Sequence, residues 1–257
     1  MTATVDEIAP DLFRITCFND AANFQFSSFL VRDDEPLLYH TNLRGYFDEI
    51  LTGVRSVLDP ATLRWVGFSH FESDECGALN DWLGIAPHAE PVCSFVGART
   101  SIGDFADRAP RVLEADERLE TGSHRFRVLE TKHVPHGWDA SLLYEETDST
   151  LFCSDLLGQG GNVEAMYEGD IVGRSDDGGC GSVYQRNAPY PGRAGRVESE
   201  DPRLYARVEF FGRLRAGIAR FRRGAGAPER RHDTLGRLEW SRKLPRRKKN
   251  GGRSLPT

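Results

Sequence analysis

The sequence of 257 residues predicts an α/β layered fold, and three observations lead to this prediction. Over the first 173 residues, short apolar runs of strand length alternate with segments whose apolar residues recur at helical spacing. Gly, Pro, Asn and Asp residues, which favour turns, separate these segments. Hydrophobic residues make up 39% of the chain and charged residues 28%, which is the composition of a globular protein with a sizeable core.

The elements are expected in the following order. Residues 12–18 and 24–31 form two strands joined through Asn19 and Asp20, and a third apolar run covers residues 36–40. A helix follows, because apolar residues recur at helical spacing from Tyr46 to Leu58 and Pro60 then ends the pattern. Further strands are expected over residues 63–68, 91–95, 125–129, 141–144 and 150–153, and further helices over residues 75–82 and 98–107. The last two strands read as a hairpin, and the alternation of strands and helices indicates layers.

The charge of the chain changes sign near Gly173. Residues 1–173 hold 12 basic and 30 acidic side chains, a formal charge of −18, whereas residues 174–257 hold 21 and 9, a charge of +12. We therefore expect a folded domain over residues 1–173 and a divergent, Arg/Gly-rich and partly disordered segment over residues 174–257. Within that segment, the apolar spacing predicts an amphipathic helix over residues 203–223.

Three interpretations of the basic segment remain open. It is a solvated tail, or a surface for an anionic partner, or the product of a shifted reading frame in a GC-rich gene. Nucleic acid is a weak prediction for such a partner, because no stacking aromatic residues are interleaved with the basic run from Arg246 to Lys249. Translation of the other two frames downstream of the Gly173 codon tests the third interpretation, which requires an apolar His-Gly segment in one of them.

Cysteine usage and the N-terminus predict a cytoplasmic protein. The five cysteines are odd in number, widely spaced and without a C-x-x-C pair, which favours reduced thiols over disulfides or a thiolate zinc site. The first residues lack the basic and apolar pattern of a secretion signal. No run approaches the roughly 18 apolar residues of a membrane helix, so no membrane partner is expected.

A loop rich in metal-ligating side chains directly follows the strand at residues 63–68. His70, Glu72, Asp74 and Glu75 place one imidazole and three carboxylates within six residues. Crowding such groups at the end of a buried strand is costly unless a cation neutralises the carboxylates and the imidazole serves as a ligand. The loop therefore predicts a metal site.

Two later segments repeat this arrangement. His136 lies in a polar loop after the strand at residues 125–129, and Asp155 directly follows the strand at residues 150–153. Loops at strand ends are where sheet-based folds place their sites, so the three loops are expected to converge at one edge. The candidate ligands are His70, Glu72, Asp74, Glu75, His136 and Asp155.

The order His-x-Glu-x-Asp, a distant His and then Asp after Leu-Phe-Cys-Ser resembles the metallo-β-lactamase fold, and within it the oxygen-binding di-iron branch found in flavodiiron proteins. The resemblance covers about residues 5–173. It implies an αββα sandwich in which His70, Glu72 and His136 hold a first iron, Asp74 serves a second and Asp155 bridges both. Glu72 stands where hydrolases of this fold carry a second His, which favours iron over zinc.

Two positions depart from the di-iron pattern. Glu75 stands where the branch usually has His, and no His is found near Ala216, where its last His would fall. His232 has a basic setting unlike the apolar His-Gly loop of the branch. Either Glu75 is itself a ligand of a carboxylate-rich pair, or the second metal site is weak and one carboxyl group is protonated.

Each candidate residue also has a purely structural interpretation. Asp74 would serve equally as the N-cap of a helix, and Glu75 as an acid in its first turn. His40, His133 and Asp139 are candidates for supporting positions around the ligands, yet they also suit a core His, a strand-end His and a turn cap. No catalytic residue beyond the ligands is predicted.

The sequence thus leaves three functions open. The first is a non-haem di-iron protein that binds or reduces O₂ or NO; with no flavin domain recognised in the chain, reduction would need an external electron donor. The second is a metal-dependent hydrolase of an ester or thioester, with zinc as the alternative metal. The third is a sensor of O₂ or NO, or an inactive relative. The expected partner is a small-molecule ligand, and a homodimer is compatible with each function.

Overall fold

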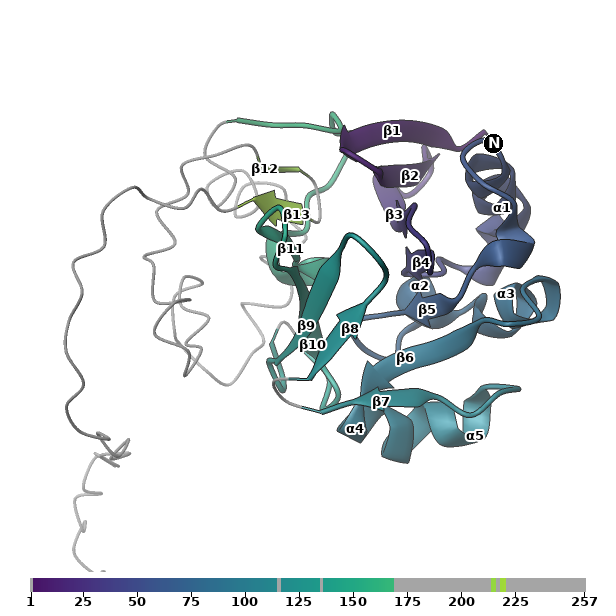
Figure 1. Cartoon of the computed structure of the whole chain (residues 1–257). Coiled ribbons are helices and arrows are strands. Elements are labelled where there is room, and N and C mark those ends of the chain that lie inside the picture. The colour runs from purple at the N-terminus through teal and green to yellow at the C-terminus, as the bar shows by residue number, and fades with distance from the viewer. Residues whose placement is uncertain (1, 115–116, 135, 169–213, 216–217, 221–257) are drawn as a thin grey trace, which may run out of the picture. The chain divides into compact units, whose positions relative to one another are not determined.

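The computed structural model describes residues 2–114, 117–134, 136–168, 214–215 and 218–220, the last two ranges by their backbone alone. The described residues form two β-sheets and a set of short helices (Figure 1). None of the helices in this part of the chain has the length and apolar character required to span a membrane.

The first sheet has seven strands in chain order. They are β1 (Thr4–Ala9), β2 (Leu12–Asn19), β3 (Phe24–Val31), β4 (Leu37–Tyr39), β5 (Trp65–Gly67), β6 (Glu90–Ser94) and β7 (Arg111–Leu113). Strands β1 to β4 pair antiparallel, and β4 to β7 pair parallel. Because β4 and β5 are parallel neighbours, the loops after both strands emerge at the same edge of the sheet.

The second sheet is antiparallel and has the order β12-β13-β11-β10-β9-β8. Its strands are β8 (Arg118–Glu120), β9 (Arg125–Glu130), β10 (Ser141–Glu145), β11 (Thr150–Phe152), β12 (Leu214–Arg215) and β13 (Ile218–Arg220). The expected hairpin at residues 145–149 is confirmed, since β10 pairs with β11 through Glu145 opposite Thr150.

The two sheets pack face to face. Alternate residues of the first sheet, among them Phe29 and Tyr39, meet alternate residues of the second, among them Phe126 and Phe152, in one buried cluster. The ring of Phe152 makes edge contacts with Phe29 and Tyr39 at centroid distances of 5.5 and 5.3 Å. This interface is the core of a β-sandwich.

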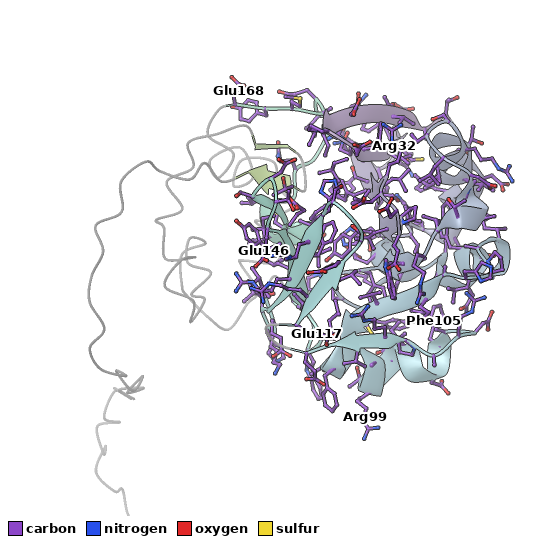
Figure 2. All side chains as sticks on the ribbon, in the orientation of Figure 1. Arg32, Arg99, Phe105, Glu117, Glu146 and Glu168 are labelled. Carbon is purple, nitrogen blue, oxygen red and sulfur yellow. The ribbon has the colours of Figure 1, made fainter. Side chains whose placement is uncertain are left out.

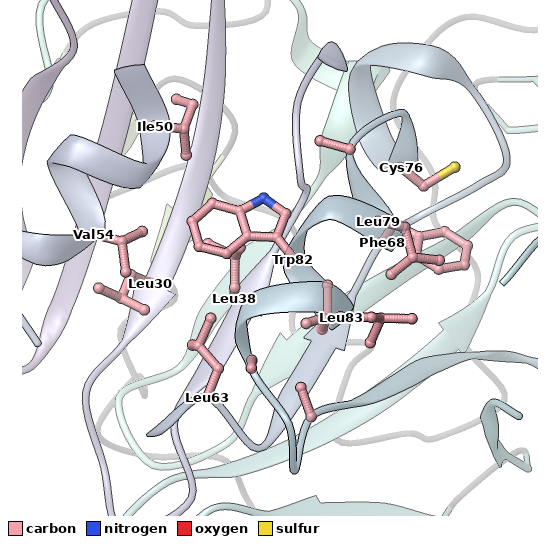
Figure 3. Packing of buried hydrophobic residues seen from close by; sticks show 14 of the residues in the cluster. Leu30, Leu38, Ile50, Val54, Leu63, Phe68, Cys76, Leu79, Trp82 and Leu83 are labelled. Atoms are coloured by element: carbon pink, nitrogen blue, oxygen red, sulfur yellow. The ribbon is translucent and has the colours of Figure 1, made fainter. Parts of the chain in front are cut away.

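Helices cover the outer face of the first sheet. They are α1 (Phe47–Arg55), α2 (Ser73–Cys76), α3 (Leu79–Ile85), and a continuous helical segment made of α4 (Phe95–Gly97), a π-helical turn η3 (Ala98–Ile102) and α5 (Gly103–Phe105). Short 3₁₀ turns η1 (Arg44–Tyr46), η2 (Pro60–Thr62) and η4 (Ser154–Leu157) complete the set. Trp82 of α3 is fully buried between Leu38 of the sheet and Ile50 of α1 (Figure 3).

The predicted α/β fold is confirmed, with corrections at particular elements. The helix expected over residues 98–107 begins earlier, at Phe95, and ends at Phe105. Strands β1, β7 and β8 were not predicted. The helix expected over residues 203–223 is wrong at residues 214–215 and 218–220, which form β12 and β13, because pairing of β13 with β11 satisfies the backbone groups of that strand. The rest of that helix lies outside the described residues.

Most charged side chains lie at the surface of this sandwich, although Arg14, Glu75, Arg127 and Glu145 are buried. Figure 2 shows Arg99, Glu117 and Glu146 at the periphery, away from the packed interior of the two sheets. Four cysteines of the described part, Cys17, Cys76, Cys93 and Cys153, are free and buried, as expected for reduced thiols. The separation of the chain into a domain at residues 1–173 and a divergent segment remains a prediction, since most of residues 174–257 lie outside the described residues.

Candidate metal centre

The first predicted ligand loop lies directly after β5 and leads into α2. Backbone hydrogen bonds hold it against the loop after β4: Thr41 N–H donates to the Glu75 carbonyl at 2.7 Å, and Ala78 N–H donates to the Asn42 carbonyl at 3.2 Å. On the opposite side, Phe71 N–H donates to the Asp139 carboxylate at 2.8 Å. The loop is therefore fixed from both the first sheet and the segment that precedes β10.

Four of the six expected ligands form a first group. The ligand atoms of His70, Glu72, His136 and Asp155 all lie within 4.8 Å of one another. His70 Nε2 is 3.1 Å from Glu72 Oε2 and 3.6 Å from Asp155 Oδ2. His136 Nε2 is 3.3 Å from the same Glu72 oxygen and 3.1 Å from the same Asp155 oxygen. Two imidazoles and two carboxylates from three loops thus face one point.

A second group contains only carboxylates. Ligand oxygens of Glu72, Asp74 and Glu75 also lie within 4.8 Å of one another. The two groups share Glu72, whereas the resemblance assigns the bridging position to Asp155. All six expected ligands are therefore brought together at one edge of the sandwich.

Charge and burial in this centre shift the pKa values of its groups. Burial, with the nearby Asp155 and Asp74 carboxylates, raises the pKa of Glu75 well above its ordinary value. Burial alone would also raise the pKa of Asp155, yet the hydrogen bond with His136 and the neighbouring imidazoles of His70 and His40 hold it below its ordinary value. The same hydrogen bond raises the pKa of His136 against the opposing effect of burial.

The donor set fits a divalent metal ion. Glu75 is 3% exposed, and its Oε2 has no hydrogen-bond partner among the described residues, although it lies 3.9 Å from His70 Nε2. A buried carboxylate oxygen without a partner is costly, and a cation bound to it removes that cost. Carboxylate and imidazole donors without thiolate suit iron or a similarly hard ion, and the four free cysteines take no part.

A pocket of ≈ 80 Å³ opens beside the second group. Its apolar lining comes from β3, the last residue of η4 and the segment after η4, and its polar lining includes His40, Asp74, Glu75 and Asp155. The apolar wall residues are Phe24, Phe26, Phe29, Leu157 and Val163. The described residues thus combine the carboxylate group with a small pocket of mixed polar and apolar lining.

The three residues expected around the ligands have different settings. His40 is buried, and burial lowers its pKa to about 3, so its ring is neutral; its Nε2 lies 3.1 Å from the Ser69 hydroxyl, and it belongs to neither metal group. Asp139 accepts the Phe71 N–H and so holds the ligand loop. His133 is exposed, contacts the Trp138 ring at 6.5 Å between centroids and belongs to neither metal group.

Two serines near the ligands were not assigned a role from the sequence. Ser69 precedes His70, and Ser154 precedes Asp155, and their hydroxyl oxygens lie 2.7 Å apart. The signal available in the sequence was their shared position, a small hydroxyl side chain directly before a ligand at the end of a strand. Ser154 and His40 both have left-handed backbones, with φ of 49° and 65°. Such non-glycine residues mark sites where the fold sustains strain.

Comparison with known proteins places the chain in a family. A family model described as "ODP family beta lactamase" matches residues 24–172. The chain is 23% identical over 162 residues to the anaerobic nitric oxide reductase flavorubredoxin of Salmonella arizonae, covering 62% of this chain and 34% of that protein. It is 26% identical over 136 residues to the rubredoxin-oxygen oxidoreductase of Megalodesulfovibrio gigas, covering 52% and 34%.

A solved structure shows the same fold. The flavodiiron protein from Giardia intestinalis is similar with a TM-score of 0.60 at 15% identity, over 68% of this chain and 47% of that chain. This likeness, together with the family model, confirms the predicted metallo-β-lactamase type of sandwich. The chain spans about a third of the length of these curated relatives. Because the family model matches more than half of its residues, the chain belongs to the family described as ODP family beta lactamase.

Proposed function

We propose that this protein holds a non-haem di-iron centre that binds or reduces O₂ or NO. The observation that carries the proposal is the convergence of two imidazoles and four carboxylates into two adjoining groups that share Glu72. The names of the relatives agree with it, since one is a nitric oxide reductase and another a rubredoxin-oxygen oxidoreductase.

The proposed ligands divide between two ions. His70, Glu72, His136 and Asp155 would hold the first, and Asp74 and Glu75, with Glu72 or Asp155 as the bridge, would hold the second. The four carboxylates Glu72, Asp74, Glu75 and Asp155 carry a formal charge of −4, which two divalent cations balance. Glu75 would thus replace the imidazole expected from the resemblance, and its Oε2, which has no hydrogen-bond partner among the described residues, supports that role.

The residues around the centre would select a small ligand. Bound iron would supply electrons to a diatomic ligand, and the protein would supply a small pocket beside Asp74, Glu75 and Asp155. This pocket measures ≈ 80 Å³, below the roughly 300–1,000 Å³ of sites for larger organic molecules, whereas a second cavity, lined by Glu72 and Phe71, measures ≈ 800 Å³. Phe24, Phe26 and Phe29 give the smaller pocket an apolar wall suited to an uncharged diatomic. Reduction of the ligand would draw on an external electron donor.

Nitric oxide titration tests this function. Iron-loaded, chemically reduced, full-length protein is mixed with NO without oxygen, and the visible and electron paramagnetic resonance spectra are recorded. The proposal predicts a saturable iron-nitrosyl signal and consumption of NO when reductant is in excess. An iron-loaded protein that gives no nitrosyl signal would contradict it, and a zinc-containing protein that hydrolyses thioesters would support the hydrolase instead.

Removal of a shared ligand gives a second test of the same centre. Glu72→Ala deletes the carboxylate common to both groups, so we expect metal content to fall by at least half and the nitrosyl signal to be lost. Glu120→Ala is the matched control, because Glu120 is an exposed glutamate of β8 that forms an ion pair with Arg125 and belongs to neither metal group. Equal metal content in the Glu72→Ala variant and the wild type would refute the ligand assignment.

A further inference from the structure

The hydroxyl group of Ser69 lies at the junction of a buried polar network. Its Oγ is 2.9 Å from His70 Nδ1, 3.1 Å from His40 Nε2 and 2.7 Å from Ser154 Oγ. Ser69, His70 and His40 are all at least 95% buried. Ser154 continues the network as a donor to Glu75 Oε1, at 3.5 Å. Ser69, through Ser154, therefore connects His70 of the first metal group with Glu75 of the second.

The backbone of Ser69 is also fixed across the two sheets. Its carbonyl accepts hydrogen bonds from Ser141 N–H at 2.9 Å and from the Ser141 hydroxyl at 3.1 Å. Ser141 begins β10 of the second sheet, whereas Ser69 follows β5 of the first. The Ser69 hydroxyl is thus held at a defined place beneath His70 before any metal binds.

The geometry around His70 leaves one arrangement that serves a metal. Nε2 faces Glu72 and Asp155 in the first group, and Nδ1 faces Ser69. An imidazole that binds a metal through Nε2 carries its proton on Nδ1, and that proton needs an acceptor. Ser69 Oγ provides the acceptor. Its hydroxyl group in turn donates a hydrogen bond to His40 Nε2 or Ser154 Oγ.

Two strained residues support a specific purpose for this network. His40 and Ser154 come from different sheets, and each has a left-handed backbone that places its side chain on Ser69. A non-glycine residue adopts this conformation only at an energetic cost that the surrounding structure offsets. Stacking on Tyr39, with ring centroids 4.5 Å apart, fixes the His40 ring in turn.

We infer that Ser69 is a positioning residue, which holds the His70 imidazole with Nδ1–H bonded and Nε2 directed at the metal, and that His40 acts through it. The inference deepens the proposed function, since it rests on His70 being a metal ligand. It does not depend on which metal binds or on whether O₂ or NO is the substrate.

Metal affinity tests this role with variants of the full-length protein. Ser69→Ala is expected to weaken Zn²⁺ and Fe²⁺ binding by about 10–100-fold, measured by competition with a chelator, and Ser69→Thr, which retains a hydroxyl, is expected to restore most of it. Ser28→Ala is the matched control, because Ser28 is fully buried and its Oγ has no partner among the described residues. Unchanged affinity in Ser69→Ala, or equal loss in Ser28→Ala, would overturn the inference.

A spectroscopic measurement separates positioning from general stability. In the zinc-loaded protein labelled with ¹⁵N-histidine, we expect a downfield Nδ1–H resonance from His70, as for a hydrogen-bonded imidazole, and an upfield shift of it in Ser69→Ala. Absence of that resonance in the wild type would overturn the inference even if the variant did not fold. Because zinc is the probe, failure of the protein to bind NO would leave this result standing and would count only against the proposed function.

Discussion

Glu75 is the residue at which the metal-free and metal-bound states of this protein should differ most. It belongs to α2, a helix of only four residues. The dipole of so short a helix is small, so it stabilises the Glu75 carboxylate little. Its side chain is buried beside Asp155 and Asp74, and one oxygen lacks a partner among the described residues. A buried, unpaired carboxylate destabilises the folded state until a cation or a proton compensates it.

Glu75→Gln should therefore stabilise the metal-free protein and weaken the second metal site. Because burial raises the pKa of Glu75 above 4.5, the metal-free wild type should lose stability as pH rises from about 4.5 through the raised pKa. The variant should lack this loss and be about 1–3 kcal/mol more stable at pH 7. Urea unfolding of the metal-free proteins measures the difference, and metal analysis should give about one ion per chain for the variant.

Glu120→Gln changes an exposed carboxylate in the same way and should alter neither quantity. Two results together would show that Glu75 is a structural residue and not a ligand. The metal-free Glu75→Gln variant would be less stable than the metal-free wild type, and the metal-loaded variant would still bind two ions.

Among the elements, β9 and β10 share a buried ionic pair away from the metal centre. His124, beside the start of β9, places Nδ1 3.5 Å from Oε1 of Glu145, the last residue of β10. Interaction with the nearby Glu145 carboxylate raises the pKa of His124, with burial acting against it. Burial alone would raise the pKa of Glu145, but His124 and the N–H groups of Asp148 and Thr147 lower it.

These opposite shifts predict a window of pH in which the pair stabilises the fold. The contribution of His124 is complete below its unfolded pKa of about 6.5 and is lost as pH rises through its higher folded value. The contribution of Glu145 is complete above about 4.5 and is lost as pH falls through its lower folded value. The pair should therefore stabilise most between about pH 4.5 and 6.5.

Chemical unfolding across pH, with His124→Gln as the comparison, measures this window. Glutamine keeps a polar side chain but cannot titrate, so the difference in unfolding free energy between wild type and variant should be largest inside the window. A difference that grows steadily above pH 7 would show that the charged form of His124 does not stabilise the fold.

For the whole molecule, Asp33 connects the two sheets on the side away from the metal loops. It follows β3, and its carboxylate accepts hydrogen bonds from the Thr121 hydroxyl at 2.8 Å, Ser123 N–H at 3.0 Å and His124 N–H at 2.9 Å, in the turn between β8 and β9. Burial works against ionisation of this carboxyl group, yet these bonds lower the pKa of Asp33 to about 2.

Asp33→Ala should leave several turn donors without their acceptor and destabilise the sandwich by about 1–3 kcal/mol. Thermal or urea unfolding measures the loss. Asp34→Ala is the control, since Asp34 is the adjacent exposed aspartate, and it should change stability by no more than about 0.5 kcal/mol. Equal effects of the two substitutions would show that the turn does not depend on Asp33.

Much of the fold of the whole molecule, and most of the candidate metal centre, could be predicted from the sequence. Apolar runs marked the strands that end at the site, and His70, Glu72, His136 and Asp155 stood directly after or near those ends. Strand order then brings the loops together, because β4 and β5 are parallel neighbours and β11 lies beside β10.

The rest could not be predicted, for physical reasons that differ by residue. Strand β1 has few buried positions, and β7 and β8 have three residues each, too few to show a period. The burial of Glu75 depends on packing against the loop after β4, which no local pattern encodes. The contacts of Ser69 require the left-handed backbones of His40 and Ser154, which only the complete fold sustains.

We infer that six side chains of this sandwich hold two iron ions, and elemental analysis of full-length protein isolated without added metal measures this content. Four carboxylates and two imidazoles in adjoining groups predict about two iron ions per chain, with zinc well below that level. Stoichiometric zinc with little iron, or protein that stays metal-free and binds no Fe²⁺ when it is supplied, would contradict the claim.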